Sequence, residues 1–428
     1  MEVSVLSKRI VIIGGGFGGL YAAKNLVKSG AHITLIDKRN FHLFQPLLYQ
    51  VASGGLSPGD IASPLRAIFK RYQQIETLMA EVLDIDLANK KVKLADRELG
   101  FDYLIVATGS THSYFQHPEW ETFAPGLKTI EDALEMRRRI FRAFEQAELC
   151  QDPEQRAAWL RFVVIGGGPT GVELAGAIGE LAHYTLKNDF RQFQSAETEV
   201  LLLEGGPQIL SAYPPDLAQA AVRKLNQLGV TVKTKTLLTE LDAHQIKVKS
   251  GDQVSHIRTE TVLWAAGVKA SPLGAILAKA SGAELDRQGR VQVGSTCALP
   301  NHPNVFVIGD LAHYTFKGAP LPGVAPVAMQ QGKFVARWIR ADLAGKNHPK
   351  FRYFDKGNLA VLGRNAAIAK FRRLKFRGFP AWLVWALVHI HYLIEFDNKV
   401  LVSLQWGWNF LTRKRGARLI SQKSDERS

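Results

Sequence analysis

The sequence predicts an α/β protein with two Rossmann-like, parallel-sheet domains, the first of them discontinuous, and with helices at the C-terminal end. Two observations predict the domains: a Gly-x-Gly-x-x-Gly loop occurs twice, and each copy lies between two short apolar runs. An apolar run, a glycine-rich turn, a helix-like stretch and a second apolar run form the pattern of a β-α-β unit. A third observation predicts the helices, because Trp-rich apolar runs and clustered Lys and Arg follow residue 363.

The first glycine loop lies in residues 9–38, RIVIIGGGFGGLYAAKNLVKSGAHITLIDK. Gly14 permits a tight turn, Gly16 lets the backbone approach a pyrophosphate, and Gly19 lets helix and strand pack closely. The phosphates would lie at the helix N-terminus, and the acid that ends the second run is placed to accept hydrogen bonds from ribose hydroxyls. The residues that we expect to bind this dinucleotide are Gly14, Gly16, Phe17, Gly18, Gly19 and Asp37.

The second glycine loop begins at Arg161, with RFVVIGGGPTGVELAGAIGELA, and its next strand, EVLLLEGG, ends at Glu204. The interval to this acid is longer than usual. A carboxylate suits a free 2′-hydroxyl and repels a 2′-phosphate, so Glu204 favours NADH over NADPH. The alternative is a strand-end acid that faces solvent. The residues expected to bind this nucleotide are Gly166, Gly168, Pro169, Thr170, Gly171 and Glu204.

Three further strand ends finish in small residues: DYLIVATGS at 102–110, TVLWAAGVK at 261–269 and NVFVIGDLA at 304–312. Two dinucleotide folds in one chain indicate a flavoprotein that takes hydride from a nicotinamide. In that case Asp310 is placed to hold the ribitol chain of FAD. The cofactor-binding residues expected at these strand ends are Thr108, Gly109, Gly267, Gly309 and Asp310.

The last strand of the first domain thus returns after the whole second domain. We expect an FAD-binding part at 1–120, an NADH-binding domain with connecting helices at 121–290, a second FAD-binding part with a quinone-side segment at 291–362, and a membrane-anchoring segment at 363–428.

The last segment is both basic and apolar. Residues 363–418 carry eleven Lys or Arg and two acids, in a chain whose net charge is +15. The apolar runs at 379–388 and 400–411 are too short to span a bilayer. Trp favours the membrane–water boundary, and Lys and Arg attract anionic headgroups. We therefore expect this segment to lie in an anionic membrane surface without crossing it; an ordinary dimer interface is the alternative, and the two can coexist.

The composition of the chain bears on its cellular location and on its binding partners. The two cysteines, Cys150 and Cys297, form no CxxC pair, which fits a reducing cytoplasmic setting. The N-terminal residues run straight into a strand with no cleavable apolar segment. Nucleic-acid binding is disfavoured because the basic residues are interleaved with apolar ones. The expected location is the cytoplasmic face of a membrane, as a peripheral or monotopic protein.

The sequence resembles type II NADH:quinone oxidoreductase, the single-subunit, non-proton-pumping NADH dehydrogenase. Five segments carry the resemblance besides the glycine loops: NFHLFQPLLYQVASGGLSPGDIASPLR, LWAAGVKASPL, VFVIGDLAH, LPGVAPVAMQQG and the tail RGFPAWLVWALVHIHYLIEFDNKVLVSLQWGWNFLTRKRGARLI. The resemblance spans roughly residues 8–420. It implies FAD as cofactor, NADH as donor, a membrane quinone as acceptor and a possible homodimer.

The resemblance also implies site residues. Glu173, in the first turns of the helix that follows the second loop, is expected to be catalytic and to reach the nicotinamide and the flavin edge; the simpler alternative is a helix-end acid stabilised by the dipole. Gln45 is expected beside the cofactor. The family often has Ala-Gln-x-x-x-Gln where the quinone head is thought to bind, and Ala325 and Gln330 match it, but Pro326 replaces the first Gln. Gln330 is therefore the second expected catalytic residue.

Two other functions stay open at this point. A sulfide:quinone oxidoreductase shares the architecture, but it needs redox cysteines and no nicotinamide site. A membrane-attached sensor that binds FAD and NADH and turns over slowly has the same sequence features.

Overall fold

The computed structural model describes residues 7–412 and 415–420, which divide into two compact units. Unit 1 contains the residues up to Leu43, Ala62–Thr111 and Val268–Asp355. Unit 2 contains Phe44–Ile61, His112–Gly267 and the residues from Lys356 onward. The chain therefore enters unit 2 three times, and the segment 44–61 packs there although both its neighbours in sequence belong to unit 1.

Unit 1 is built on a six-stranded sheet in the order β20-β21-β9-β1-β2-β5. Its strands are Ala298–Leu299 (β20), His302–Val307 (β21), Tyr103–Val106 (β9), Arg9–Ile13 (β1), His32–Asp37 (β2) and Ile75–Met79 (β5). All neighbours are parallel except β20 and β21. Helices α1 (Phe17–Leu26) and α11 (Ala325–Leu343) pack against each other, and Gly332 of α11 lies so close to α1 that a Cβ would stand 2.3 Å from the Gly18 carbonyl oxygen.

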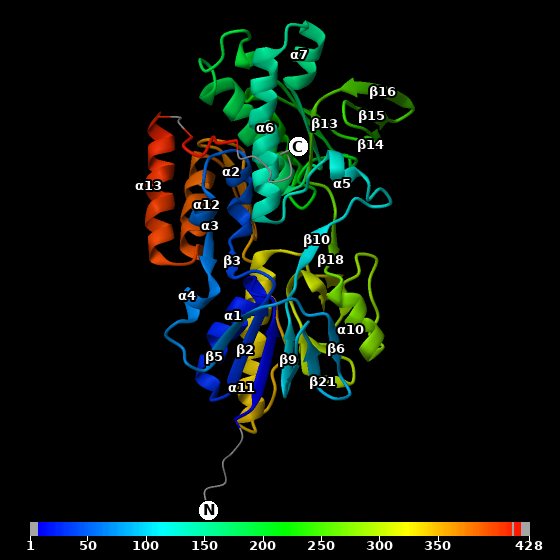
Figure 1. Cartoon of the computed structure of the whole chain (residues 1–428), viewed down its shortest axis with the longest axis vertical. Coiled ribbons are helices and arrows are strands. Elements are labelled where there is room, and N and C mark those ends of the chain that lie inside the picture. Colours follow the sequence, from blue (N-terminus) through cyan, green and yellow to red (C-terminus); the bar gives the residue numbers. More distant parts are fainter. Residues whose placement is uncertain (1–6, 413–414, 421–428) are drawn as a thin grey trace, which may run out of the picture. The chain divides into compact units, whose positions relative to one another are not determined.

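Smaller elements complete unit 1 (Figure 1). The three-stranded antiparallel sheet β6-β7-β8 and helix α10 bury apolar side chains against the main sheet. The remaining elements are β3 (Phe41–Leu43), β4 (Ala62–Pro64), α4 (Leu65–Phe69), β6 (Asp84–Asp86), β7 (Lys91–Lys93), β8 (Glu98–Gly100), β18 (Val268–Ala270), α10 (Leu273–Ser281), β19 (Val291–Gln292), β22 (Ala312–His313), β23 (Thr315–Phe316) and β24 (Ala319–Pro320).

Unit 2 is built on a four-stranded parallel sheet in the order β13-β12-β11-β17. Its strands are Val230–Lys233 (β13), Glu199–Leu203 (β12), Arg161–Ile165 (β11) and Thr261–Trp264 (β17). Helices α8 (Pro169–Glu180) and α9 (Pro215–Gln227) cover the sheet, and α6 (Ile130–Leu149) and α7 (Pro153–Trp159) precede it. An antiparallel sheet of β14 (Thr236–Leu241), β15 (Gln245–Ser250) and β16 (Gln253–Arg258) follows.

The C-terminal part of unit 2 starts with a second antiparallel sheet, β25 (Asn358–Val361), β26 (Ala367–Phe371) and β27 (Leu374–Gly378). Helices α12 (Phe379–Tyr392) and α13 (Phe396–Thr412) then lie side by side (Figure 1). The short helices α2 (Leu48–Ala52) and α3 (Pro58–Ile61) come from segment 44–61; α2 contacts α6 and α8, and α3 contacts α13. Helix α5 (Trp120–Phe123) also belongs to unit 2, whereas strand β10 (Ser110–His112) spans the point in the sequence where unit 1 ends and unit 2 resumes.

This architecture confirms the predicted α/β class, with two parallel-sheet domains, the first of them split in sequence. The structure has no helix, within the ranges that it describes, that is long and apolar enough to cross a membrane. The predicted boundaries of the four segments stay predictions.

Candidate functional site

The first glycine loop forms a tight backbone cradle in unit 1. Gly14 has a φ of +103°, and a Cβ on Gly19 would stand 1.8 Å from the Gly14 carbonyl oxygen. Helix α1 begins at Phe17, and the N-cap Gly16 has no side chain to bond the first N–H groups of the helix. The loop therefore needs glycine at positions 14 and 19, and it leaves helix N–H groups available to an anion.

Asp37 binds the same loop from the end of β2. Its Oδ2 accepts a hydrogen bond from Gly15 N at 2.6 Å, and its Oδ1 accepts one from Arg39 N at 2.8 Å. Burial raises the pKa of Asp37, and these two bonds oppose that rise. The carboxylate thus orients the loop, and the predicted contact of Asp37 with a ribose stays a prediction.

The strand ends β9 and β21 lie beside each other at the same edge of the sheet, since Val106 pairs with Val307. Ser110 Oγ donates to Asp310 Oδ2 at 2.9 Å, which links the two ends. Thr108 Oγ1 lies 2.6 Å from Ser271 Oγ. The structure thus brings the predicted residues Thr108, Gly109, Gly309 and Asp310 together at the edge where β1 leads into the glycine loop.

Gln330 and Gln331, which are neighbours on α11, bind different backbone groups. Gln331, which sequence reasoning missed, is buried, and its Oε1 accepts from Gly309 N at 2.7 Å, so it fixes the turn after β21. The predicted Gln330 binds the backbone of Phe354 with both ends of its amide, at 2.9 and 3.0 Å. Ala325 is the first residue of the helix.

The second glycine loop repeats this geometry in unit 2. Gly166 has a φ of +107°, and a Cβ on Gly171 would stand 1.9 Å from the Gly166 carbonyl oxygen. Glu204 accepts from Gly167 N at 2.7 Å and from Gly206 N at 2.6 Å. Helix α8 begins at Pro169, whose missing N–H suits the first helical position. Both predicted nucleotide loops therefore have the expected form.

Two other predicted residues lie in unit 2. Gly267 follows β17 with a φ of +72°, and its carbonyl oxygen accepts from Ser113 N at 3.3 Å. Gln45, at the start of segment 44–61, donates from Nε2 to the Lys128 carbonyl oxygen at 3.1 Å. The Gln45 amide therefore ties this segment to the N-terminal end of α6.

Glu173 borders a pocket that is built wholly from unit 2. Its Oε1 accepts from Val361 N at 3.3 Å, and burial raises the pKa of its carboxyl to about 8. The side chain therefore carries a proton at neutral pH. A helix-end acid in solvent would not have this raised pKa; the catalytic role of Glu173 stays a prediction.

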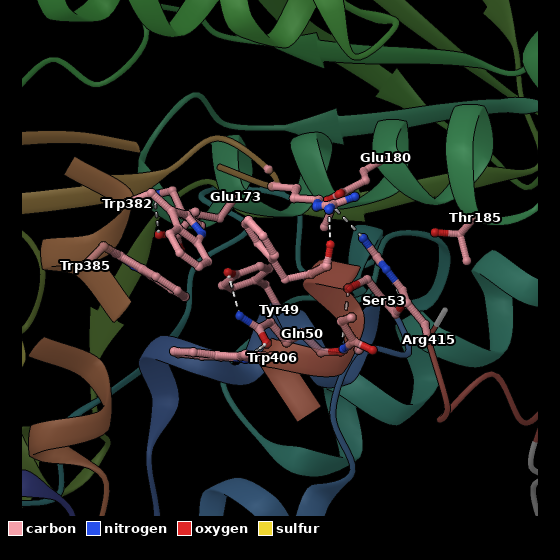
Figure 2. A pocket seen from close by; sticks show the side chains of 17 residues that line it. Tyr49, Gln50, Ser53, Glu173, Glu180, Thr185, Trp382, Trp385, Trp406 and Arg415 are labelled. Atoms are coloured by element: carbon pink, nitrogen blue, oxygen red, sulfur yellow. Dashed lines mark hydrogen bonds and ion pairs between the residues drawn. The ribbon is translucent and has the colours of Figure 1, made fainter. Parts of the chain in front are cut away.

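The pocket encloses about 120 Å³ between α2, α8, the end of β25, α12 and α13 (Figure 2). Its aromatic walls come from the C-terminal helices, where the rings of Trp385 and Trp406 stack with centroids 5.0 Å apart. Its polar end holds Arg415, whose guanidinium donates to the Ser53 carbonyl oxygen at 3.0 Å and lies 3.4 Å from the Glu180 carboxylate. Burial lowers the pKa of Arg415.

Apart from Glu173, sequence reasoning missed the polar residues of this pocket. Trp406 Nε1 donates to Gln50 Oε1 at 2.8 Å, and Gln50 Nε2 donates to Tyr49 Oη at 2.9 Å. Burial raises the pKa of Tyr49, so it stays a neutral hydroxyl. The segment FQPLLYQVA and the Trp-rich tail are conspicuous in the sequence, but only the fold shows that they meet.

The chain is similar in sequence and in fold to known proteins. Residues 8–332 match the family model described as pyridine nucleotide-disulphide oxidoreductase. The chain is 46% identical to the type II NADH:quinone oxidoreductase Ndh of Mycobacterium tuberculosis over 97% of this chain and 90% of that protein. It resembles the structure of NDH2 from Plasmodium falciparum in complex with NADH, with a TM-score of 0.85 and 18% identity, over 97% of this chain and all of that chain. It also resembles the sulfide:quinone oxidoreductase from Aquifex aeolicus, with a TM-score of 0.72 and 18% identity, over 92% and 95% of the two chains.

Proposed function

Because the chain belongs to the type II NADH:quinone oxidoreductase family, we propose that it oxidises NADH and passes the electrons through a bound FAD to a membrane quinone, without pumping protons. The observation that carries this proposal is the pair of glycine cradles, one in each unit, each with a carboxylate that bonds its loop. Two such cradles fit a flavin dinucleotide and a nicotinamide dinucleotide.

The cradle of unit 1 fits FAD. Gly14 and Gly19 are needed for the tight turn and the close packing of the loop, whereas a Cβ on Gly16 would point into open space, where a pyrophosphate can approach the backbone. The residues of unit 1 that we propose to hold this cofactor are Gly14, Gly16, Phe17, Gly18, Gly19, Asp37, Thr108, Gly109, Gly309, Asp310 and Ala325. The cofactor contacts predicted for Gln45 and Gly267, which belong to unit 2, stay predictions. When bound, the flavin accepts a hydride equivalent and delivers electrons to the acceptor.

The cradle of unit 2 is proposed to hold NADH. Glu204 would accept hydrogen bonds from the adenosine ribose and repel a 2′-phosphate, which selects NADH. Glu173 lies further along α8, and we propose that its protonated carboxyl contacts the nicotinamide. We propose that Gln330 contributes to the acceptor side of the flavin by ordering the backbone at Phe354.

The C-terminal helices are proposed to dock on an anionic membrane surface. Exposed apolar side chains follow a four-residue spacing on both helices: Phe379, Leu383 and Leu387 on α12, and Phe396, Val400, Leu404 and Trp408 on α13. Such a stripe buries in the lipid interface, while nearby Lys and Arg meet headgroups. The protein would thus be monotopic, on the cytoplasmic face. The alternative is that the same stripes form the interface of a homodimer. Two residues of the basic cluster, Arg413 and Lys414, lie outside the described residues.

The sulfide:quinone alternative finds little support. Sulfide oxidation needs redox cysteines that act together, whereas Cys150 and Cys297 are free and belong to different units. Burial also raises the pKa of Cys297, which keeps it a thiol.

The direct test uses purified, flavin-loaded, full-length protein. We expect rapid NADH oxidation when a short-chain quinone is added, little oxidation without an acceptor, and none with sulfide as donor. A turnover below one per minute with NADH and quinone would contradict the enzyme proposal and favour the sensor. Sedimentation with anionic and neutral vesicles tests the membrane proposal, because only anionic vesicles should retain the protein strongly at low salt.

A further inference from the structure

Gly15 of the first glycine loop is held at both of its backbone groups. Its N–H donates to Asp37 Oδ2 at 2.6 Å, and its carbonyl oxygen lies 2.8 Å from Nδ1 of His42, a residue of β3. A carbonyl oxygen only accepts hydrogen bonds, so Nδ1 of His42 carries the proton and donates it. Burial lowers the pKa of His42 to about 4, so the imidazole is neutral at pH 7 and this is its single N–H.

The fold fixes the ring of His42 and keeps it away from any ligand. Strand β3 pairs with β4, where His42 lies opposite Ser63, and the ring meets Phe17 edge to face with centroids 5.1 Å apart. His42 is 1% exposed, and its Nε2 has no hydrogen-bond partner in the described part of the chain. An apolar ring would fill this space without an unpaired polar atom, so packing alone does not account for a histidine here. What distinguishes His42 from such a ring is the bond to Gly15.

This bond sets the direction of a peptide plane. The peptide between Gly15 and Gly16 is trans, so the Gly15 carbonyl and the Gly16 N–H point in opposite directions. With the carbonyl held by His42, the Gly16 N–H points away from the ring at the start of α1. A Cβ on Gly16 would lie in open space, and no partner for the Gly16 N–H is found among residues 7–412 and 415–420. This N–H is therefore available to a phosphate, together with the positive end of the helix.

The second glycine loop holds the same atoms with a different donor. Glu204 accepts from Gly167 N as Asp37 accepts from Gly15 N, but the Gly167 carbonyl oxygen accepts from the backbone N–H of Leu210 at 2.7 Å. Both loops thus fix the same peptide plane although the groups around them differ. The constraint accordingly belongs to the cradle rather than to the packing of β3. In unit 1 the donor is a side chain, so a substitution can remove it.

We propose that His42 is a positioning residue of the flavin site: its Nδ1–H holds the Gly15 carbonyl and thereby directs the Gly16 N–H toward the pyrophosphate of the dinucleotide. The identity of the dinucleotide rests on the proposed function. His42 itself does not contact the cofactor, and its effect passes through one peptide plane.

Flavin release tests this role without turnover. Flavin-loaded, full-length protein is diluted in steps, and the fluorescence of the released FAD gives its Kd. We expect His42→Phe, which keeps a ring and removes the N–H, to raise this Kd about 5- to 30-fold. His42→Asn should restore it to within about threefold of the unmodified protein, because the Asn Nδ2 stands where the imidazole has Nδ1 and donates in the same direction. A role in packing alone predicts the reverse order, since Phe fills the space and Asn does not.

His183→Phe is the matched control, because His183 lies in unit 2 and its Nε2 is also buried without a partner in the described part of the chain. It should leave the Kd of FAD within twofold. The Kd of NAD⁺, measured by equilibrium dialysis, should stay within twofold in every His42 variant, because the loop proposed to bind it is held by Leu210. Unfolding temperatures verify that each variant is folded. If His42→Phe does not fold, His42→Ala replaces it and is compared with His42→Asn, which differs from it by the amide.

Three outcomes overturn the proposal. In the first, folded His42→Phe or His42→Ala binds FAD within twofold of the unmodified protein. In the second, His42→Asn releases FAD as readily as the variant without a donor, which means that the ring and not the N–H matters. In the third, FAD and NAD⁺ weaken together, which means that the substitution disturbs the whole chain. If the unmodified protein binds FAD and oxidises NADH in these cases, only the role of His42 fails; if the unmodified protein binds no flavin, the proposed function fails with it.

Discussion

The glycine loops of units 1 and 2 share their backbone geometry but lead into different helices. The φ angles of Gly14 and Gly166 differ by only a few degrees, and each loop donates a backbone N–H to the carboxylate that ends the next strand. At the fifth helical position, however, α1 carries Tyr21, whereas α8 carries Glu173 with a raised pKa. The cradle is therefore generic, and the chemistry that distinguishes the units lies further along the helix.

The largest effects are expected from substitutions that disrupt the two glycine loops, one at a time. A Cβ at Gly19 or Gly171 would lie within 2 Å of a loop carbonyl oxygen, so the loop must open. We expect Gly19→Ala to weaken flavin binding at least about 100-fold, and Gly171→Ala to weaken NADH binding equally while flavin stays bound. Flavin content and NADH titration measure the two losses.

Gly59→Ala serves as the control for these variants, because a Cβ there has open space. Flavin loss in Gly171→Ala equal to that in Gly19→Ala would contradict the separation of the two cradles.

The second expected effect concerns the pH dependence of stability. The native carboxyl of Glu173 keeps its proton up to about pH 8, whereas an unfolded Glu releases it near pH 4.5. Between these values the native state binds more protons, so rising pH lowers the free energy of unfolding, by up to about 1.4 kcal/mol per pH unit. Glu173→Gln should flatten this slope, as urea midpoints at pH 5.5 and 7.5 would show. Equal slopes in both proteins would mean that the carboxyl ionises normally.

The difference between the loops also explains what sequence could predict. Glycine spacing and strand-end acids are local features of sequence, so the positions of Gly14, Gly166, Asp37 and Glu204 beside the two loops could be predicted. The loop N–H groups that Asp37 and Glu204 bind were not predicted. The family resemblance, rather than any spacing rule, indicated Glu173. Its raised pKa depends on burial beside Val361, from a segment far along the chain, and no local pattern encodes that contact.

The pocket could not be predicted from the sequence for a similar reason. Tyr49 precedes Trp406 by more than 350 residues, and the link between them passes through Gln50. For Gln330, the match to the family pattern predicted a ligand contact. The sequence did not predict that its side-chain amide binds the backbone of Phe354.

The third expected effect tests the helix position that separates the two units. Glu173→Gln should slow NADH-dependent flavin reduction at least about tenfold in stopped-flow measurements, because a positioned acid contributes of that order or more. The flavin should remain bound, since the cradle proposed for it lies in unit 1. Tyr21→Phe changes the corresponding position of α1 and should leave the rate within twofold. An unchanged rate in Glu173→Gln would leave the residue a structural acid.

The smallest expected effect compares the two strand-end carboxylates. Glu204 bonds Gly167 N and Gly206 N with its two oxygens, and Gln at this position keeps only one acceptor oxygen and no charge. Without the charge, the repulsion of a 2′-phosphate falls, so Glu204→Gln should reduce the kcat/KM preference for NADH over NADPH about three- to tenfold.

Asp37→Asn makes the same change in the other cradle. It should lower flavin affinity, because Asp37 bonds Gly15 of the loop proposed to bind flavin, while the ratio of kcat/KM for NADH to that for NADPH stays constant. Equal kcat/KM values for NADH and NADPH in the unmodified protein would refute the role of Glu204 outright. A ratio that shifts equally in both variants would show that the two acids act through loop stability, and the comparison between the cradles would then lose its chemical meaning.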